Sequence, residues 1–374
     1  MNKSNLDQRS SARRFLSRLL GWVRRVVRHA PHHTRKIFLH TLRRVGKNIL
    51  QTLRRVGLEK AVRHGPWYVR RIPRHLLGMS RKLWKTFRAT MIGLHVLRIV
   101  QIVLHPLEYF RRRTQATRLN LPSQHIFIDR RSGYRRFDWS GKSEVSELVA
   151  LCRLIWQNKQ QAIFDPNGRV KDEFLKDLLN DALLREHPQL VNFALRDEIL
   201  NVAIRYLGTI PVLRTVGLLF STPRDYRRDS MLLHKDPEDF EQIKLFLNVF
   251  DIDERHGPFT FLPADVSVKV MNGFKHKDGR GRMHRRYSDV ESLEFCDRSD
   301  FVSVMGPTGS GTLVDTCRCL HFGSRVSPGS FRLVYYVQFC RFHHPVLTSV
   351  NRFDRERFRN DPVRWQALTP SRRY

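Results

Sequence analysis

The chain has 374 residues, of which 41% are hydrophobic, so it can bury a sizeable core in one to three domains. It carries 68 Lys and Arg residues against 35 Asp and Glu residues, which gives a formal net charge of +33. The five cysteines are an odd number in a long chain, which argues against a disulfide-stapled scaffold and indicates a reducing compartment.

The positive charge is concentrated in residues 1–118, which hold 29 Lys and Arg but three acidic residues, a net of +26. Within this range, residues 13–110 show the apolar spacing of basic amphipathic helices, including a TLRRVG repeat at 41–46 and 52–57. Such helices bind anionic membrane surfaces, so we expect a cytoplasmic protein that is peripheral on the inner face of a membrane. Packing on the rest of the chain or on a partner is one alternative. Nucleic acid is a less favoured one, because it needs no apolar stripe.

The least polar part of this region, residues 89–107, approaches the length that spans a membrane. His95, Arg98 and His105 interrupt it, and ionisable side chains are costly in the interior of a bilayer. Whether this stretch spans the membrane, lies flat on it or packs internally stays open from the sequence.

A linker is expected at 119–141, followed by a folded domain at 142–345 and a basic C-terminal tail at 346–374. The domain opens with amphipathic helices predicted at residues 144–160, 171–186 and 194–207. Strands are predicted from β-branched and aromatic runs at residues 212–221, 243–251, 259–262, 301–305, 311–317 and 331–339. Short strands after a helical lead-in predict an α+β fold with a double-stranded β-helix of the jelly-roll or cupin-like type. The Lys-, His- and Gly-rich residues 272–286 predict a mobile loop.

A His-x-Asp pair with one distant histidine is the ligand set that holds ferrous iron on one face and leaves the other open. In this chain the pair is His234 and Asp236, and the distant histidine is His321. Two residues apart on an extended segment, the paired side chains point to the same side. Arg332 follows, and its planar guanidinium suits a carboxylate because it binds both oxygens at once. Spacing alone also fits a surface His-Asp pair and an ordinary core histidine.

The surrounding sequence contains four distinctive segments, in the order YLGTIPVL (206–213), LHKD (233–236), FLNVFDIDERHGPFTFLP (246–263) and GTLVDTCRCLHFGSR (311–325). With Arg332 behind them, they resemble the phytanoyl-CoA dioxygenase-like branch of the Fe(II)/2-oxoglutarate oxygenases, over about residues 140–345. The resemblance implies a double-stranded β-helix that holds Fe(II) on His234, Asp236 and His321. It also implies 2-oxoglutarate and O2 as cosubstrates, with release of succinate and CO2. Related halogenases carry a small residue in place of the carboxylate, so the aspartate favours hydroxylation.

Further side chains are candidates for holding 2-oxoglutarate. Arg332 is the predicted clamp for its distal carboxylate, and Arg325 is the competing guanidinium. Ser324 is a candidate hydroxyl donor, and Gly323 is the alternative position that the resemblance leaves open for this helper. Lys244 and Asn248 lie on one face of their predicted strand and are further candidates for lining this pocket.

Two other ligand-binding patterns are less specific. Cys317, Cys319 and His321 alternate along one strand face and suggest zinc, but structural zinc sites take four ligands and no partner CxxC is present. We interpret the two cysteines as small core residues. The glycine-rich GPTGSG at 306–311 lacks the Lys-Ser/Thr ending of a phosphate loop, so we expect a connection between strands.

The sequence therefore predicts an Fe(II)- and 2-oxoglutarate-dependent dioxygenase that hydroxylates an organic substrate. The basic N-terminal region favours a lipid or another membrane-associated metabolite, with a small-molecule metabolite as the alternative. Two other functions stay open. One is a non-catalytic basic scaffold on a degenerate oxygenase fold that binds membrane or nucleic acid, and the other is an oxygenase acting on nucleic acid. The oligomeric state is not predicted.

Overall fold

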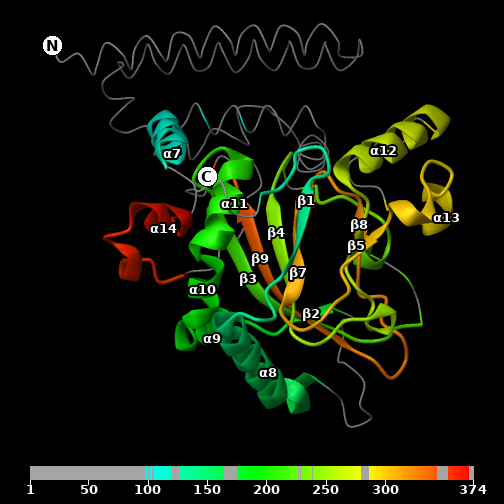
Figure 1. Ribbon diagram of the computed structural model, residues 1–374, viewed down its shortest axis with the longest axis horizontal. Helices are drawn as coiled ribbons and strands as arrows, with labels where there is room; N and C mark the ends of the chain where they lie inside the picture. Colours follow the sequence, from blue (N-terminus) through cyan, green and yellow to red (C-terminus); the bar gives the residue numbers. More distant parts are fainter. Residues whose placement is uncertain are drawn as a thin grey trace, which may run out of the picture. The chain divides into compact units, whose positions relative to one another are not determined.

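The chain divides into two compact units, Met1–Lys85 together with Tyr374, and Thr86–Arg373. The computed structural model describes residues of the second unit, namely 98, 102, 105–119, 127–163, 175–225, 227, 229–237, 239–278, 286–342 and 353–369 (Figure 1). The amphipathic helices predicted between residues 13 and 97, and most of the stretch 89–107, lie outside the described residues. Among the helices that are described, none combines the length and the apolar composition that a membrane crossing requires.

Two antiparallel sheets and a set of helices make up the described fold. The strands are β1 (Tyr134–Asp138), β2 (Leu175–Asp177), β3 (Val212–Ser221), β4 (Ile243–Asn248), β5 (Thr260–Phe261), β6 (Val302–Ser303), β7 (Ser310–Val314), β8 (His321–Phe322) and β9 (Arg332–Cys340). The α-helices are α7 (Pro106–Arg118), α8 (Ser143–Ile163), α9 (Asp181–Glu186), α10 (Gln189–Ala194), α11 (Asp197–Leu207), α12 (Ala264–Asp278), α13 (Asp289–Ser292) and α14 (Pro362–Ala367). The large sheet has the order β1-β7-β4-β9-β3-β2, and the small sheet has the order β6-β5-β8.

Side chains on β4 alternate between two hydrophobic cores, as expected for a strand with both faces covered. Its odd-numbered residues enter the larger core, which also contains residues of α8, α10 and α11. Phe246 enters the second core, and alternation places Lys244 and Asn248 on the same face as Phe246. Figure 1 shows α8, α10 and α11 on one side of the large sheet, with β5 and β8 on the other side.

Aromatic side chains fill the space between the two sheets. The Phe246 ring stacks on Phe259 with ring centroids 4.2 Å apart. Tyr134 meets Phe261 of the small sheet edge-on at 4.7 Å. Because these rings come from both sheets, the inner faces of the sheets bury one another, and polar residues on those faces are held between them.

Most predicted strands coincide with observed strands. The predicted strand at 212–221 is β3 with the same bounds, and the prediction at 331–339 differs from β9 by one residue at each end. These strands are easy to find because they are buried on both faces, so their sequences are nearly continuous hydrophobic runs. α11 ends where predicted, at Gly208, whose φ of 66° is the left-handed conformation that ends many helices.

Two segments expected outside the folded domain belong to it. β1 lies in the predicted linker 119–141 and pairs along β7. It is an edge strand on which only Phe137 is buried, so its exposed arginines gave it the composition of a basic linker. In the predicted tail 346–374, α14 and the residue after it bury Ala367 and Leu368 in the larger core.

Two further assignments were wrong in part. Of the helix predicted at 171–186, residues 181–186 are helical as α9, whereas Leu175–Asp177 form β2, which pairs with β3. Asn180 starts α9, because its side chain accepts a backbone N–H of the first turn at 2.9 Å. The loop predicted at 272–286 is helical up to Asp278, because Phe274 is anchored in a buried cluster under the exposed Lys and His side chains.

A fully buried arginine ties α7 to the rest of this unit, although α7 falls within the predicted basic region 1–118. Arg112 is 0% exposed, and its Nε lies 2.6 Å from a carboxylate oxygen of Glu108. Its remaining nitrogens donate to the backbone carbonyl oxygens of Ile210, Pro211, Gln366 and Thr369 at 2.8–3.2 Å. One side chain therefore joins α7, the start of β3 and α14.

Replacing Arg112 with alanine is expected to lower the free energy of unfolding by about 3–5 kcal/mol. The substitution leaves four carbonyl oxygens and Glu108 without their buried partner. Removing one residue of a buried ion pair destabilises proteins by about this amount. Urea unfolding of the two proteins measures the difference. Arg113→Ala is the matched control, because the exposed Arg113 side chain donates to Tyr109 and should change stability by less than about 0.5 kcal/mol. Equal effects of the two substitutions would contradict this account of α7.

Candidate metal centre

The structure brings the three predicted metal ligands together in the inter-sheet space. His234 and His321 face each other across an antiparallel bridge, in which each backbone N–H donates to the other's carbonyl oxygen at 3.0 and 2.8 Å. Their ring centroids lie 4.4 Å apart. With Asp236, their ligand atoms all lie within 4.8 Å of one another, so one ion can contact all three. This is the sole such group of three His, Cys, Asp or Glu side chains within the described part of the chain.

Backbone carbonyl groups fix which nitrogen of each imidazole is available to a metal. Nδ1 of His234 lies 2.7 Å from the carbonyl oxygen of Leu232, and Nδ1 of His321 lies 3.0 Å from that of Cys319. A carbonyl oxygen can only accept a hydrogen bond, so each Nδ1 carries the proton. The lone pair of each neutral ring is therefore on Nε2, as in most metal-binding histidines.

Asp236 is held as a carboxylate although it is largely buried, with 9% of the residue exposed. One of its oxygens, Oδ2, lies 2.6 Å from Nζ of Lys244 and accepts a hydrogen bond from Nε2 of Gln242 at 2.7 Å. The other, Oδ1, lies 3.8 Å from Nε2 of His321. Burial by itself raises the pKa of Asp236, but the Lys244 ammonium and the other neighbours outweigh it and hold that pKa below its usual range.

The histidines are held in the complementary, neutral state. Burial, together with the neighbouring His234, lowers the pKa of His321 to about 3, and burial also lowers the pKa of His234. Two neutral imidazoles and one carboxylate are the protonation states that a divalent first-row metal ion requires. The residues present therefore fit such an ion without any rearrangement of protons.

We expect the affinity of this site for a divalent ion to fall less between about pH 7.5 and about pH 5.5 than the affinity of a site made by two ordinary histidines. A proton competes with the metal only when pH approaches the histidine pKa, and both pKa values are lowered. Two histidines with ordinary pKa values near 6.5 would lose affinity about 100-fold over the same interval. Cobalt(II) titration at several pH values distinguishes the two cases.

The two nearby cysteines do not join the metal centre. Cys317 and Cys319 are both buried, and the Cys319 thiol lies 3.6 Å from the carbonyl oxygen of Ser132, in the turn that precedes β1. Neither thiol belongs to the group of metal-capable side chains among the described residues. They pack as small core residues, and the two imidazoles and carboxylate form a site without sulfur.

Arg332 is a buried cation on the inner face of β9. It is 5% exposed, and burial lowers its pKa to about 10, so it is charged at neutral pH. Its Nη1 donates to the carbonyl oxygen of Gly257 at 2.9 Å, and its Nη2 donates to Oγ of Ser324 at 3.2 Å. Its Nε is buried without a hydrogen-bond partner, and no carboxylate of the described residues pairs with this guanidinium. A buried, incompletely satisfied guanidinium of this kind suits an anionic ligand.

Ser324 is positioned by an unusual backbone conformation. Its φ of 62° lies in the left-handed region, which a residue with a side chain adopts only when its surroundings enforce it. Its hydroxyl lies 2.9 Å from that of Ser221 on β3, which is paired in register with Arg332 on β9. Two hydroxyl groups therefore stand next to the guanidinium. The sequence predicted Ser324 as a candidate but gave no signal for Ser221.

Arg325, the competing guanidinium, already has a carboxylate partner. Its two terminal nitrogens donate to the two carboxylate oxygens of Asp289 at 2.6 and 2.8 Å, and its Nε donates to the carbonyl oxygen of Met231. It also stacks on the Phe322 ring at 3.3 Å. Each of its three nitrogens therefore donates to another part of the protein, whereas Arg332 has no such carboxylate.

Lys244 and Asn248 occupy different environments on the same face of β4. Lys244 contacts the candidate metal ligand Asp236, so the structure places it beside the metal centre rather than beside Arg332. Asn248 donates to Oγ of Ser310 at 3.2 Å and so links β4 to β7. Gln242, which precedes β4, was missed in the sequence, because an isolated glutamine carries no motif that predicts a contact with a distant aspartate.

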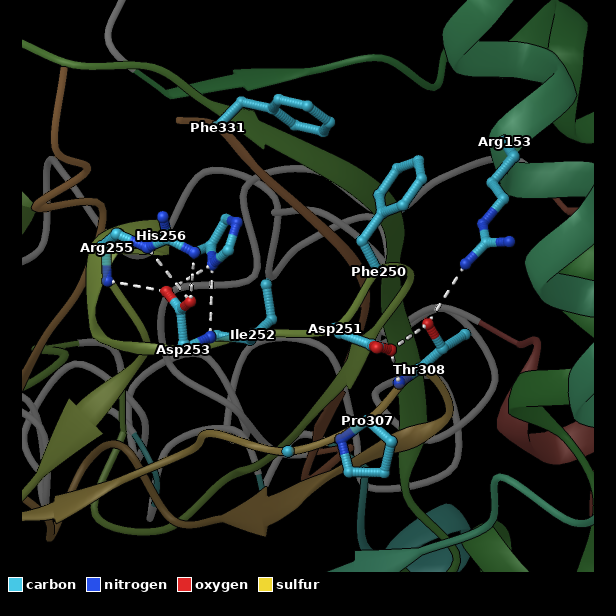
Figure 2. Close-up of a pocket in the computed structure, with 11 residues that line it drawn as sticks. Arg153, Phe250, Asp251, Ile252, Asp253, Arg255, His256, Pro307, Thr308 and Phe331 are labelled. Atoms are coloured by element: carbon cyan, nitrogen blue, oxygen red, sulfur yellow. Dashed lines mark hydrogen bonds and ion pairs between the residues drawn. The ribbon is translucent and has the colours of Figure 1, made fainter. Parts of the chain in front are cut away.

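A cavity of about 670 Å³ lies elsewhere, beside the ends of β4 and β7 (Figure 2). None of the predicted site residues lines it. Figure 2 shows that its polar and charged groups interact among themselves: Asp253 with Arg255 and His256, and Thr308 with both Asp251 and Arg153. Because these groups already have partners, the candidate site remains the polar cluster between the sheets.

Comparison of the sequence with protein-family models and with curated proteins gives no match. Among solved structures, similarity is found to SnoN, a non-heme alpha-ketoglutarate-dependent epimerase from nogalamycin biosynthesis, at 16% identity and a TM-score of 0.38, over 63% of this chain and 84% of SnoN. EctD from S. alaskensis with bound Fe is 16% identical with a TM-score of 0.38, over 65% of this chain and 88% of EctD. HygX from Streptomyces hygroscopicus, with nickel and 2-oxoglutarate bound, is 14% identical with a TM-score of 0.39, over 58% of this chain and 88% of HygX.

Proposed function

We propose that this protein is an Fe(II)- and 2-oxoglutarate-dependent dioxygenase that hydroxylates an organic substrate. One observation carries the proposal: His234, Asp236 and His321 converge, in the protonation states that iron requires, inside a fold that also buries a guanidinium without a carboxylate partner. The antiparallel sheets that enclose both features support the double-stranded β-helix predicted from the sequence.

His234, Asp236 and His321 would hold Fe(II) and would leave coordination positions open for other ligands. When bound there, Fe(II) supplies the oxidation chemistry, in which O2 and 2-oxoglutarate are consumed, succinate and CO2 are released, and one oxygen atom enters the substrate. The protein's own contribution is to direct each Nδ1 to a backbone carbonyl group, which leaves both Nε2 atoms available, and to keep the ligand atoms of the three side chains within 4.8 Å of one another. Burial of Asp236 and His321 also limits the access of water to these atoms.

Arg332 is proposed to bind the distal carboxylate of 2-oxoglutarate. Its planar fork can donate to both carboxylate oxygens, and an anion there neutralises a cation that is otherwise buried without a carboxylate. The hydroxyl groups of Ser324 and Ser221 bond to each other beside the guanidinium, which leaves one hydroxyl proton of the pair to donate to the same anion. Lys244 is proposed to act through the Asp236 carboxylate, which it contacts directly.

The substrate is proposed to be a lipid or another membrane-associated metabolite, with a small-molecule metabolite as the alternative. The support is the basic amphipathic pattern of residues 13–110 together with the motif resemblance to the phytanoyl-CoA dioxygenase-like branch. Peripheral attachment to an anionic membrane surface belongs to the same proposal. Binding to vesicles that contain anionic lipid, compared with neutral vesicles and with DNA at rising salt, tests it.

Succinate formation tests the proposed chemistry without knowledge of the substrate. Anaerobically iron-loaded protein is mixed with 2-oxoglutarate, exposed to O2, and compared with a His234→Ala variant. We expect slow succinate release by the wild-type protein that requires O2 and is lost in the variant. Absence of both succinate and iron binding in the wild-type protein would contradict the proposal and favour a non-catalytic scaffold.

A further inference from the structure

A chain of buried amide and hydroxyl groups leads from the inner wall of β9 to the candidate metal ligand Asp236. The hydroxyl of Tyr336 lies 3.1 Å from Oε1 of Gln338. Nε2 of Gln338 donates to Oε1 of Gln242 at 2.7 Å. Nε2 of Gln242 donates to Oδ2 of Asp236 at 2.7 Å and to Oγ1 of Thr316 at 2.7 Å. Gln242, Gln338, Asp236 and Thr316 are all buried.

The direction of every hydrogen bond in this chain follows from the carboxylate. An ionised aspartate can only accept, so Gln242 must present its NH2 group to Asp236 and its oxygen to the other side. That oxygen accepts from the NH2 group of Gln338 at 2.7 Å and, more weakly, from the Cys340 thiol at 3.8 Å, so Gln338 presents its NH2 group to Gln242. The oxygen of Gln338 then faces Tyr336, which must donate its hydroxyl proton. The orientation of each amide is therefore determined by its neighbour.

The chain also distinguishes the two oxygens of Asp236. Oδ2 accepts from Gln242 and lies 2.6 Å from Nζ of Lys244, whereas Oδ1 is the atom that lies toward His321. The backbone of Asp236 is fixed as well, because its N–H donates to the carbonyl oxygen of Thr316 at 3.0 Å. An oxygen that already holds two N–H donors is a poor metal ligand, so Oδ1 is left to bind the ion.

We propose that Gln242 is a positioning residue that holds Asp236 for coordination through one oxygen, and that Gln338 and Tyr336 fix the orientation of Gln242. The inference rests on the proposed function, since it assigns the metal to the His234, Asp236 and His321 site. Lys244 contributes charge to the same oxygen, but a flexible ammonium imposes little direction. The amide chain contributes the direction.

Cobalt(II) binding to metal-free protein tests this proposal with a readout other than activity. Affinity comes from titration, and the visible spectrum of the bound ion reports its coordination geometry. We expect Gln242→Leu to weaken binding by about 10- to 100-fold, the range for residues that orient metal ligands, and to change the spectrum. Gln338→Leu should produce the same spectral change with a smaller loss of affinity, because it acts through Gln242.

The double variant Gln242→Leu/Gln338→Leu separates positioning from general destabilisation. If Gln338 acts only through Gln242, the double variant should bind cobalt no more weakly than Gln242→Leu alone, whereas independent effects would add. Gln366→Leu is the matched control. Gln366 is a buried glutamine that bonds to Gln115 and to the carbonyl oxygen of Pro362, far along the chain from the metal centre, so cobalt binding should be unchanged.

Three results would overturn the inference. Wild-type affinity and spectrum in a folded Gln242→Leu variant would show that the amide does not position Asp236. Additive losses in the double variant would show that Gln338 acts independently of Gln242. Failure of the wild-type protein to bind cobalt would overturn both the inference and the proposed function. Cobalt binding that is lost only in His234→Ala would support the proposed function, and the glutamine variants would then decide the inference.

Discussion

Replacing His321 with alanine is expected to weaken Fe(II) binding by more than about 100-fold and to abolish succinate formation. The ring supplies one of three protein ligands, and removing a ligand costs more than removing a residue that only orients one, for which losses of about 10- to 100-fold are usual. Anaerobic titration with Fe(II) measures the change. The effect on folding should be smaller, because the backbone bridge between His234 and residue 321 does not involve the side chain.

A histidine outside the site provides the control. His187 follows α9, and its backbone N–H ends that helix by donating to the carbonyl oxygen of Leu183. His187→Ala should therefore leave iron affinity unchanged. Equal iron affinity in the wild-type protein and in His321→Ala would contradict the assignment of the metal centre. A comparable loss in His187→Ala would show that the measurement reports stability rather than ligation.

Replacing Arg332 with glutamine is expected to weaken 2-oxoglutarate binding by about 30-fold to several thousand-fold, while iron affinity stays within a few-fold of the wild type. Loss of one partner of a buried, hydrogen-bonded charge pair costs about 2–5 kcal/mol, and each 1.4 kcal/mol corresponds to a tenfold change. The substitution keeps a polar side chain that can still contact Ser324 and the Gly257 carbonyl group. Anaerobic titration of the iron-loaded variant with 2-oxoglutarate measures the effect.

Arg325→Gln is the matched comparison, and it decides between the two guanidinium groups that the sequence could not separate. Arg325 is paired with both carboxylate oxygens of Asp289, so its loss should affect the packing of α13 and leave the affinity for 2-oxoglutarate unchanged. The reverse pattern, in which Arg325→Gln weakens 2-oxoglutarate binding and Arg332→Gln does not, would contradict the assignment of the clamp.

The predictability of the fold followed the burial of each element. β3 and β9 are buried on both faces, so continuous apolar runs predicted their positions to within one residue at each end. β1 and β2 lie at the two edges of the large sheet and were missed, because an edge strand exposes polar side chains and its pairing depends on a distant partner. α12 was taken for a loop in its second half, where exposed Lys and His residues outnumber the buried ones.

The residues of the candidate site also divide into those that the sequence predicted and those that only the structure reveals. The spacing of His234 and Asp236, with His321 much later in the chain, was visible because metal ligation restricts residue type and strand position. The structure adds the bridge that places His321 opposite His234, a long-range pairing that no local pattern encodes. It also adds Gln242, Gln338 and the partners that separate Arg332 from Arg325, since these depend on which polar groups meet after folding. Roles that depend on three-dimensional neighbours were therefore the least predictable.

The most direct test of the central claim is anaerobic equilibrium binding of 2-oxoglutarate to the wild-type protein with and without Fe(II). In the proposed site, the metal and Arg332 both contact the same molecule of 2-oxoglutarate. Binding of Fe(II) and binding of 2-oxoglutarate should therefore be coupled. We expect one molecule of 2-oxoglutarate per chain, bound more than about tenfold more tightly when iron is present. No binding, or binding that is indifferent to both iron and the Arg332→Gln substitution, would contradict the assignment of this protein as a 2-oxoglutarate-dependent oxygenase.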